Sequence, residues 1–254
     1  MRRDWDARAQ KDALFYIEDS RHDWNSNSFF QSGESDYCTF VAPVLKQVGF
    51  DPAGKTMLEL GCGAGRMSRS FATRFKTVLA VDISPEMLKR GQQLIPDVSN
   101  IVWQQSNGSD FSNVPNESTD LVFSYLVLQH LPAEQLASKY ISEIIRVLRA
   151  GGVFLFQFNS LMTPTMNLRG RIAWAVVDTL WSSGFVRLSR GMAWAFGLDP
   201  LMAGRSWRGA PVAPDEMRAF VHNAGGTVLE LRGEGTPAAW CHGIKIAPVH
   251  SISS

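Results

Sequence analysis

Four residues suggest chemistry by their type and spacing: Gly61, Gly63, Gly65 and Asp82. The glycines occupy a turn between an apolar run and a helical pattern, where they let the backbone turn tightly and let a ligand approach it closely. Asp82 ends the next apolar run, 21 residues after Gly61. That offset puts a carboxylate beside the turn, where it can accept both hydroxyls of a ribose. The pattern therefore predicts a nucleoside site, and the alternative is a turn that only satisfies chain geometry.

The glycine spacing separates two kinds of nucleoside ligand. A dinucleotide site uses Gly-x-Gly-x-x-Gly, with its third glycine three residues after the second. Here that position is Arg66, and the third glycine comes one residue earlier, as Gly65. A ligand without a pyrophosphate also has less need of an open helix N-terminus. A nicotinamide-dependent oxidoreductase is therefore the weaker interpretation.

Apolar runs and helical patterns alternate around the turn, which predicts a parallel sheet with helices on both faces. The runs that we predict as strands are Met57–Leu60, Thr77–Val81, Ile101–Gln104, Leu121–Leu126 and Val153–Phe158. We predict helices at about 5–17, 35–48, 66–75 and 132–149, and one more that begins at residue 84. The polar residues 20–35 are predicted without a helix. Gly151 and Gly152 are expected to stop the last of these helices. Near the C-terminus a helix from Pro214 precedes two strands, 227–232 and 239–246, which we expect to close the sheet in antiparallel fashion.

The length of 254 residues suits one α/β domain, with room for a large insertion. We divide the single domain 1–254 into an N-terminal helical cover (1–50), a cofactor-binding core (51–158), a helical insertion (159–213) and a C-terminal helix with closing strands (214–254). The N-terminal helix, with Trp5, Tyr16 and Trp24, is expected to close one side of the site.

Two sequence motifs resemble a known family. Glu59-Leu-Gly-Cys-Gly-Ala-Gly65 resembles the first signature motif of class I S-adenosylmethionine-dependent methyltransferases, and Val81-Asp-Ile-Ser-Pro-Glu-Met87 resembles the second. The likeness covers about residues 57–158 and continues more weakly to Ile246. It implies a Rossmann-like fold with a mostly parallel seven-stranded sheet, and a methyltransferase whose cofactor is S-adenosylmethionine.

The resemblance also implies roles for individual residues. Gly61 and Gly63 would line the methionine and ribose portion of the cofactor, Asp82 would bind the ribose hydroxyls, and Ile83 would pack on the adenine. Four further positions are candidates for cofactor binding: Glu59, Cys62, Met87 and Tyr125.

After its third strand the family carries an acidic or amide residue that reads the adenine amino group. Here Asn107 stands where an aspartate is common, and Gly108 would supply a backbone N–H. Asp110 is the alternative if the alignment shifts. A plain Asn-Gly turn is the other interpretation.

His130 is the candidate general base. It follows the fourth strand, at the edge where open α/β sheets bind ligands, and histidine titrates near neutral pH. The same Gln-His-Leu-Pro segment could simply cap the next helix. A base is needed only where the acceptor must lose a proton. Gln157 and Asn159, at the end of the fifth strand, are polar candidates for the substrate site.

The insertion at 159–213 is longer than a connection requires, so we expect it to carry a structure or a function. We predict a helical lid whose aromatic residues, Trp174 and Trp181 among them, contact the substrate. Residues 160–210 hold six arginines, two aspartates and no lysine or glutamate, which suggests an acidic acceptor. The alternatives are a homodimer interface, extra core, or a surface that touches anionic lipid.

Composition narrows the function classes. The chain is 45% hydrophobic and 19% charged, with a net charge of +1, so it resembles a globular protein and shows no basic excess for nucleic acid. Its three cysteines are far apart, which supports neither a metal site nor a disulfide framework. We expect a cytoplasmic location and no membrane contact. The predicted function is methyl transfer to O or N of a small aromatic or lipophilic metabolite, acidic ones included. The alternative is a non-catalytic cofactor-binding scaffold or partner subunit.

Overall fold

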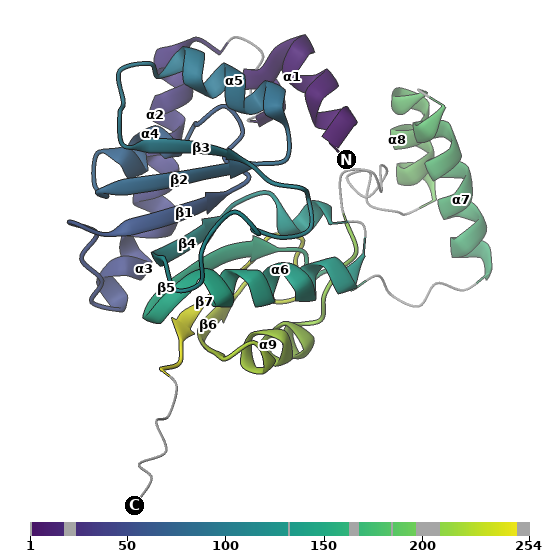
Figure 1. The fold of residues 1–254 in the computed structure, drawn as a ribbon. Helices are drawn as coiled ribbons and strands as arrows, with labels where there is room; N and C mark the ends of the chain where they lie inside the picture. Colours follow the sequence, from purple (N-terminus) through teal and green to yellow (C-terminus); the bar gives the residue numbers. More distant parts are fainter. Residues whose placement is uncertain are drawn as a thin grey trace, which may run out of the picture.

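A seven-stranded sheet in the order β3-β2-β1-β4-β5-β7-β6 forms the centre of the protein (Figure 1). The computed structural model describes residues 2–17, 24–131, 133–162, 168–183, 185–196 and 209–247. The strands are β1 (Thr56–Leu60), β2 (Thr77–Asp82), β3 (Ile101–Gln105), β4 (Thr119–Ser124), β5 (Leu148–Phe158), β6 (Gly226–Arg232) and β7 (Ala239–Lys245). Strands β1 to β5 are parallel, and β7 lies antiparallel to both β5 and β6. The predicted sheet and its antiparallel closure are confirmed.

Each face of the sheet is covered by its own hydrophobic core. Alternate side chains of β5 point to opposite faces, as a strand requires: Phe154 and Phe156 join one core, whereas Val153 and Leu155 join the other. Helices α6 (Glu134–Val147) and α9 (Pro214–Asn223) contribute to the first core, with Ile141, Ile144 and Met217 among the buried side chains. The second core packs against α2 (Ser26–Asp36), η1 (Tyr37–Val41), α3 (Ala42–Gln47), α4 (Ser68–Ala72) and α5 (Pro85–Leu94).

Local signals explain where several helices begin. Helix α5 begins at Pro85 because the side chain of Ser84 accepts a hydrogen bond from the N–H of Met87 at 3.1 Å, as an N-cap does. Helix α9 likewise has proline at its first position. The N-terminal helix α1 (Arg2–Ile17) is present too, but Asp12 has extended backbone angles and divides it into two helical segments.

Two predicted boundaries were wrong. Residues 26–36 form α2, although their polar composition predicted no helix; Asn25 and Ser28 cap the helix reciprocally and Phe29 is fully buried against the core. Helix α6 ends at Val147 rather than near residue 149, and Gly151 and Gly152 lie inside β5. Pairing with β4 begins at Leu148, so tertiary hydrogen bonding overrides the local glycine signal.

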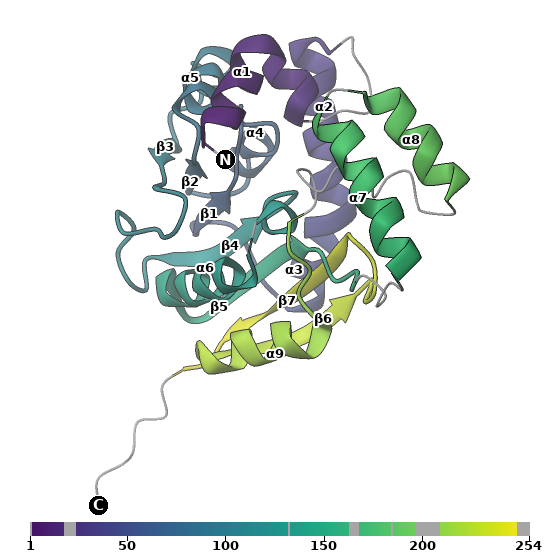
Figure 2. The ribbon, with the colours of Figure 1, turned by 90° about the vertical axis from the view of Figure 1, so that its right-hand side faces the viewer.

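The insertion after β5 contains two helices, α7 (Leu168–Ser182) and α8 (Val186–Ala195). They pack against each other and stand beyond the C-terminal edge of the parallel strands (Figures 1 and 2). At the far end of the insertion, the N–H groups of Gly209 and Ala210 donate to the carbonyls of Gln129 and Leu131. In the described ranges, we find no helix long and apolar enough to cross a membrane.

Candidate functional site

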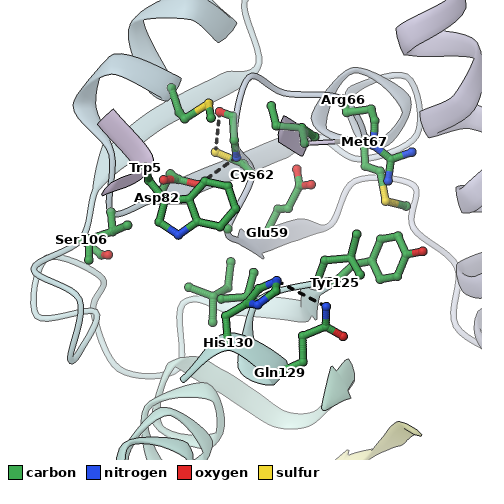
Figure 3. A pocket seen from close by; sticks show the side chains of 18 of the residues that line it. Trp5, Glu59, Cys62, Arg66, Met67, Asp82, Ser106, Tyr125, Gln129 and His130 are labelled. Atoms are coloured by element: carbon green, nitrogen blue, oxygen red, sulfur yellow. Dashed lines mark hydrogen bonds between the residues drawn. The ribbon is translucent and has the colours of Figure 1, made fainter. Parts of the chain in front are cut away.

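A pocket of about 210 Å³ opens at the C-terminal ends of β1, β2 and β4 (Figure 3). This is the edge at which open α/β sheets bind ligands. Its wall combines the glycine turn, the end of β2, the segment after β4 and part of α1. The lining residues are Trp5, Tyr16, Ile17, Glu59, Leu60, Gly61, Cys62, Gly63, Arg66, Met67, Asp82, Ile83, Met87, Ser106, Tyr125, Leu126, Val127, Gln129, His130, Leu131 and Tyr140.

The glycine turn needs its glycines for both conformation and space. Gly61 and Gly63 have φ values of +77° and +53°, which other residues rarely adopt. A Cβ on Gly61 would lie 2.0 Å from Val127, and a Cβ on Gly63 would lie 2.9 Å from Ile17. Both neighbours line the pocket. The turn therefore brings bare backbone to the pocket wall.

Asp82 is held in front of this turn by the backbone itself. Its Oδ2 accepts a hydrogen bond from the N–H of Gly63 at 2.9 Å, and its Oδ1 accepts one from the N–H of Ser84 at 2.8 Å. Burial raises the pKa of Asp82, and these N–H groups oppose that rise because they favour the charged form. The carboxylate is thus oriented, while each oxygen keeps a lone pair for a further donor.

A second buried carboxyl, Glu59, lies on the same wall. Burial raises its pKa to about 7, against the hydrogen bond from Ser68 Oγ at 2.5 Å and the positive charge of Arg66. Arg66 is itself buried and forms an ion pair with Asp36 at 2.7 Å. Its guanidinium also lies 5.8 Å from the ring centroid of Tyr125. Sequence reasoning used Arg66 only to exclude a dinucleotide and missed it as a pocket residue.

His130 faces Glu59 and Asp82 across the pocket, as Figure 3 shows. Its Nε2 lies 3.3 Å from Nε2 of Gln129, and its ring meets Trp5 edge-on at 6.1 Å. The helix η2 (Leu128–His130) follows β4 and places this side chain at the sheet edge. A hydrogen-bonded histidine on a pocket wall can exchange a proton with a bound acceptor.

Helix α1 contributes the remaining wall. Trp5 and Tyr16 line the pocket, as the sequence indicated, whereas Trp24 packs instead against Phe29. The carboxylate of Asp6 accepts a hydrogen bond from Ser84 Oγ at 2.6 Å, next to the binding turn. This bond ties α1 to the start of α5.

Of the fifteen cofactor, catalytic and substrate residues predicted from the sequence, nine line this pocket, four do not, and two have side chains outside the described part of the chain. Those that line it are Glu59, Gly61, Cys62, Gly63, Asp82, Ile83, Met87, Tyr125 and His130. Asn107, the predicted contact of the adenine amino group, lies outside the lining, whereas the preceding residue, Ser106, is part of it. The amide of Asn107 is used within its own loop: it donates to Asp110 Oδ1 and accepts from the N–H groups of Ser109 and Asp110. Gly108 also lies outside the lining, and a Cβ added to it would lie 2.6 Å from the side chain of Ile83.

The predicted substrate residues also lie elsewhere. The side chain of Asn159 accepts from the N–H of Leu161 and donates to the carbonyl of Gly209, so it holds the ends of the insertion together. Gln157 is buried in β5, and its Oε1 has no hydrogen-bond partner among the described residues. The side chains of Trp174 and Trp181 lie outside the part of the chain that is described. Of the described pocket residues, none comes from the insertion, so the lid stays a prediction.

Metal chemistry has no support in the described ranges, where no group of three or more His, Cys, Asp or Glu side chains could hold an ion. Burial raises the pKa of the Cys62 thiol well above its usual range, so this pocket residue stays neutral and is a poor nucleophile.

Comparison with known proteins shows that part of the chain is similar to methyltransferases. Residues 58–156 match the family model described as "Methyltransferase domain". The chain is 34% identical over 116 residues to a trans-aconitate 2-methyltransferase of Azoarcus sp., covering 45% of this chain and 42% of that protein. It is 32% identical over 148 residues to a malonyl-(acyl-carrier protein) O-methyltransferase of Serratia marcescens, covering 54% and 50%. The chain thus spans half or less of these curated relatives.

Among solved structures, the fold is similar to that of a magnesium protoporphyrin IX methyltransferase from Synechocystis, with a TM-score of 0.60 and 16% identity over 96% of this chain and 97% of that one. A methyltransferase from Mesorhizobium loti gives a TM-score of 0.57 at 16% identity, over 80% and 96%. These likenesses concern the fold alone. The match to the family model shows that residues 58–156 form a methyltransferase domain.

Proposed function

We propose that this protein transfers a methyl group from S-adenosylmethionine to O or N of a small metabolite. The observation that carries the proposal is the Asp82 carboxylate, which Gly63 and Ser84 orient at the glycine turn inside the pocket. An oriented carboxylate beside bare backbone suits the two hydroxyls of a ribose.

The residues present fit this cofactor. Asp82 would hold the ribose, Gly61 and Gly63 would border it with their backbone, and Ile83 and Met87 would supply the apolar wall for the adenine. When bound, the cofactor supplies an activated methyl group on a sulfonium. The chain's own task is then to align the acceptor atom and to exclude water, which α1 serves by covering the pocket.

His130 is proposed as the general base for an acceptor that must lose a proton. Its support is its place on the wall opposite Asp82 and the hydrogen bond that the Gln129 amide donates to its Nε2, which orients the ring. Tyr125 beside it presents an aromatic surface to the pocket. We expect His130→Ala to slow turnover by about a hundredfold, a typical contribution of acid–base catalysis, with little change in cofactor affinity. Equal turnover in the variant would remove His130 from the mechanism.

The acceptor is proposed to be small and aromatic or lipophilic, with an acidic group as the first kind to test. The names of two relatives specify trans-aconitate and a malonyl group, and a third, from Synechocystis, specifies a hydroquinone. In this chain the support is the aromatic pocket wall with the buried Arg66 beside Tyr125.

Calorimetric titration with S-adenosylhomocysteine tests the proposal. We expect saturable micromolar binding, no response to NAD, and at least tenfold weaker binding by Asp82→Ala, because two charge-assisted hydrogen bonds are lost. Asp97→Ala removes an exposed carboxylate away from the pocket and serves as the matched control. Binding of NAD would favour the oxidoreductase instead. Cofactor binding with no turnover on any acceptor would favour a non-catalytic scaffold.

A further inference from the structure

The hairpin of α7 and α8 carries large apolar side chains that nothing in the described structure covers. Trp194 is 78% exposed, Phe185 61%, Ile172 58% and Leu188 55%. Isolated exposed hydrophobic residues are ordinary, but several on adjoining helices indicate an interaction surface.

The hairpin is nevertheless a well-formed unit. Val177 and Ala193 are fully buried, and the hydroxyl of Ser189 on α8 donates to the carbonyl of Val177 on α7 at 2.8 Å. The two helices pack chiefly against each other rather than against the sheet. The exposed apolar residues are therefore not needed for the contact between α7 and α8.

Positive charge accompanies this apolar surface. The two helices contain Arg169, Arg171, Arg187 and Arg190 against a single acid, Asp178, and Arg169 and Arg187 are exposed. A helix that combines arginine with tryptophan, phenylalanine and leucine suits the boundary between lipid headgroups and acyl chains. Negatively charged headgroups attract such arginines.

A second copy of the chain suits this surface less well. A two-fold contact brings the same patch together from both subunits, so the exposed Arg169 and Arg187 of one copy would approach those of the other. Like charges at an interface are unfavourable. An anionic bilayer instead offers negatively charged headgroups to the arginines and an acyl-chain region to the exposed apolar side chains.

We propose that the α7–α8 hairpin docks the protein on an anionic bilayer surface. The sequence favoured a lid and gave contact with anionic lipid only as an alternative for this insertion, because it does not show that Trp194 and its neighbours remain uncovered. The hairpin stands beyond the C-terminal edge of the parallel strands (Figure 1), which is the edge where the residues that line the pocket lie. Docking there brings the pocket side of the protein towards the lipid. The inference does not depend on methyl transfer.

Co-sedimentation with vesicles tests the docking. We expect the full chain to pellet with vesicles of phosphatidylcholine and phosphatidylglycerol, at least fivefold less with phosphatidylcholine alone, and less at high ionic strength. The variant Leu188→Gln/Trp194→Gln should lose at least fivefold in partitioning while keeping its circular dichroism spectrum. The matched control, Val102→Gln/Leu229→Gln, removes two comparably exposed apolar residues from the two edge strands and should pellet like the wild type.

Two results would overturn the proposal. One is a wild-type chain that stays in the supernatant with anionic vesicles, or that pellets no more than its Leu188→Gln/Trp194→Gln variant. The other is a dimeric wild type and a monomeric variant by light scattering, which would assign the surface to a second copy. Because no methyl acceptor is used, failure here leaves the proposed function standing, and failure of cofactor binding leaves the docking test intact.

Discussion

At the scale of single residues, Glu59 is a carboxyl whose ionisation depends strongly on folding. Burial raises its pKa from 4.5 to about 7. The folded chain therefore binds more protons than the unfolded chain between these values, so this group lowers stability as the pH rises from about 4.5 to 7, with no further change above that range. The full effect is about 3 kcal/mol, from the energy of one pKa unit.

Replacing Glu59 by glutamine removes the charge and keeps an acceptor for Ser68. We expect the free energy of unfolding of Glu59→Gln, relative to that of wild type, to be larger at pH 8 than at pH 5 by about 2–3 kcal/mol, so that the variant gains relative stability as the pH rises. Urea unfolding at the two pH values measures this. A difference between the two proteins that does not vary with pH would show that Glu59 is already ionised across the range.

Site residues could be predicted from the sequence where backbone geometry alone fixes their positions. The glycine turn and Asp82 follow from spacing, because their positions depend on strand and turn geometry alone. Asn107 shows the limit, since its amide can either reach a ligand or close its own turn, and the choice depends on Ser109 and Asp110 beside it. Arg66 could not be placed either, because its partner Asp36 lies on a distant helix and no sequence pattern indicates that the two side chains meet.

At the scale of elements, α1 acts as a cover that one hydrogen bond ties to the core. Asp6 accepts from Ser84 Oγ, and α1 packs on α5. Asp6→Ala should loosen α1 and speed tryptic cleavage at Arg8 and Lys11 roughly three- to tenfold, as loss of a hydrogen bond to a charged group allows local opening. Asp97→Ala, which removes an exposed carboxylate elsewhere, should leave the cleavage rate unchanged. Equal rates in wild type and Asp6→Ala would show that packing alone holds α1.

Elements with clear end signals were predicted well, and those without them were not. Ser84 with Pro85, and Pro214, mark helix starts by local hydrogen bonding and backbone geometry. Helix α2 was missed because its serines and asparagines have low helix propensity, while the burial of Phe29 supplies the stabilisation. The insertion was correctly expected to be helical, but its packing depends on long-range contacts that periodicity does not contain.

At the scale of the whole molecule, one aromatic cluster joins three distant parts of the chain. Trp240 on β7 stacks on Phe40 of η1 at 5.0 Å and on Tyr125 after β4 at 5.2 Å, and lies 6.2 Å from Phe123. Tyr125 is also part of the pocket wall. The closing strand β7 thus contacts a residue of the site.

Removing this indole should therefore affect stability and the pocket together. We expect Trp240→Ala to lower the free energy of unfolding by about 2–4 kcal/mol, because Trp240 is only partly exposed and its loss leaves a cavity between packed rings. Leu229→Ala, on the neighbouring β6 and about half exposed, should cost less than about 1 kcal/mol. Urea unfolding of both variants makes the comparison. If Trp240→Ala cost no more than Leu229→Ala, the stacked rings would be neighbours without energetic coupling, and the C-terminal strands would close the sheet without supporting the site.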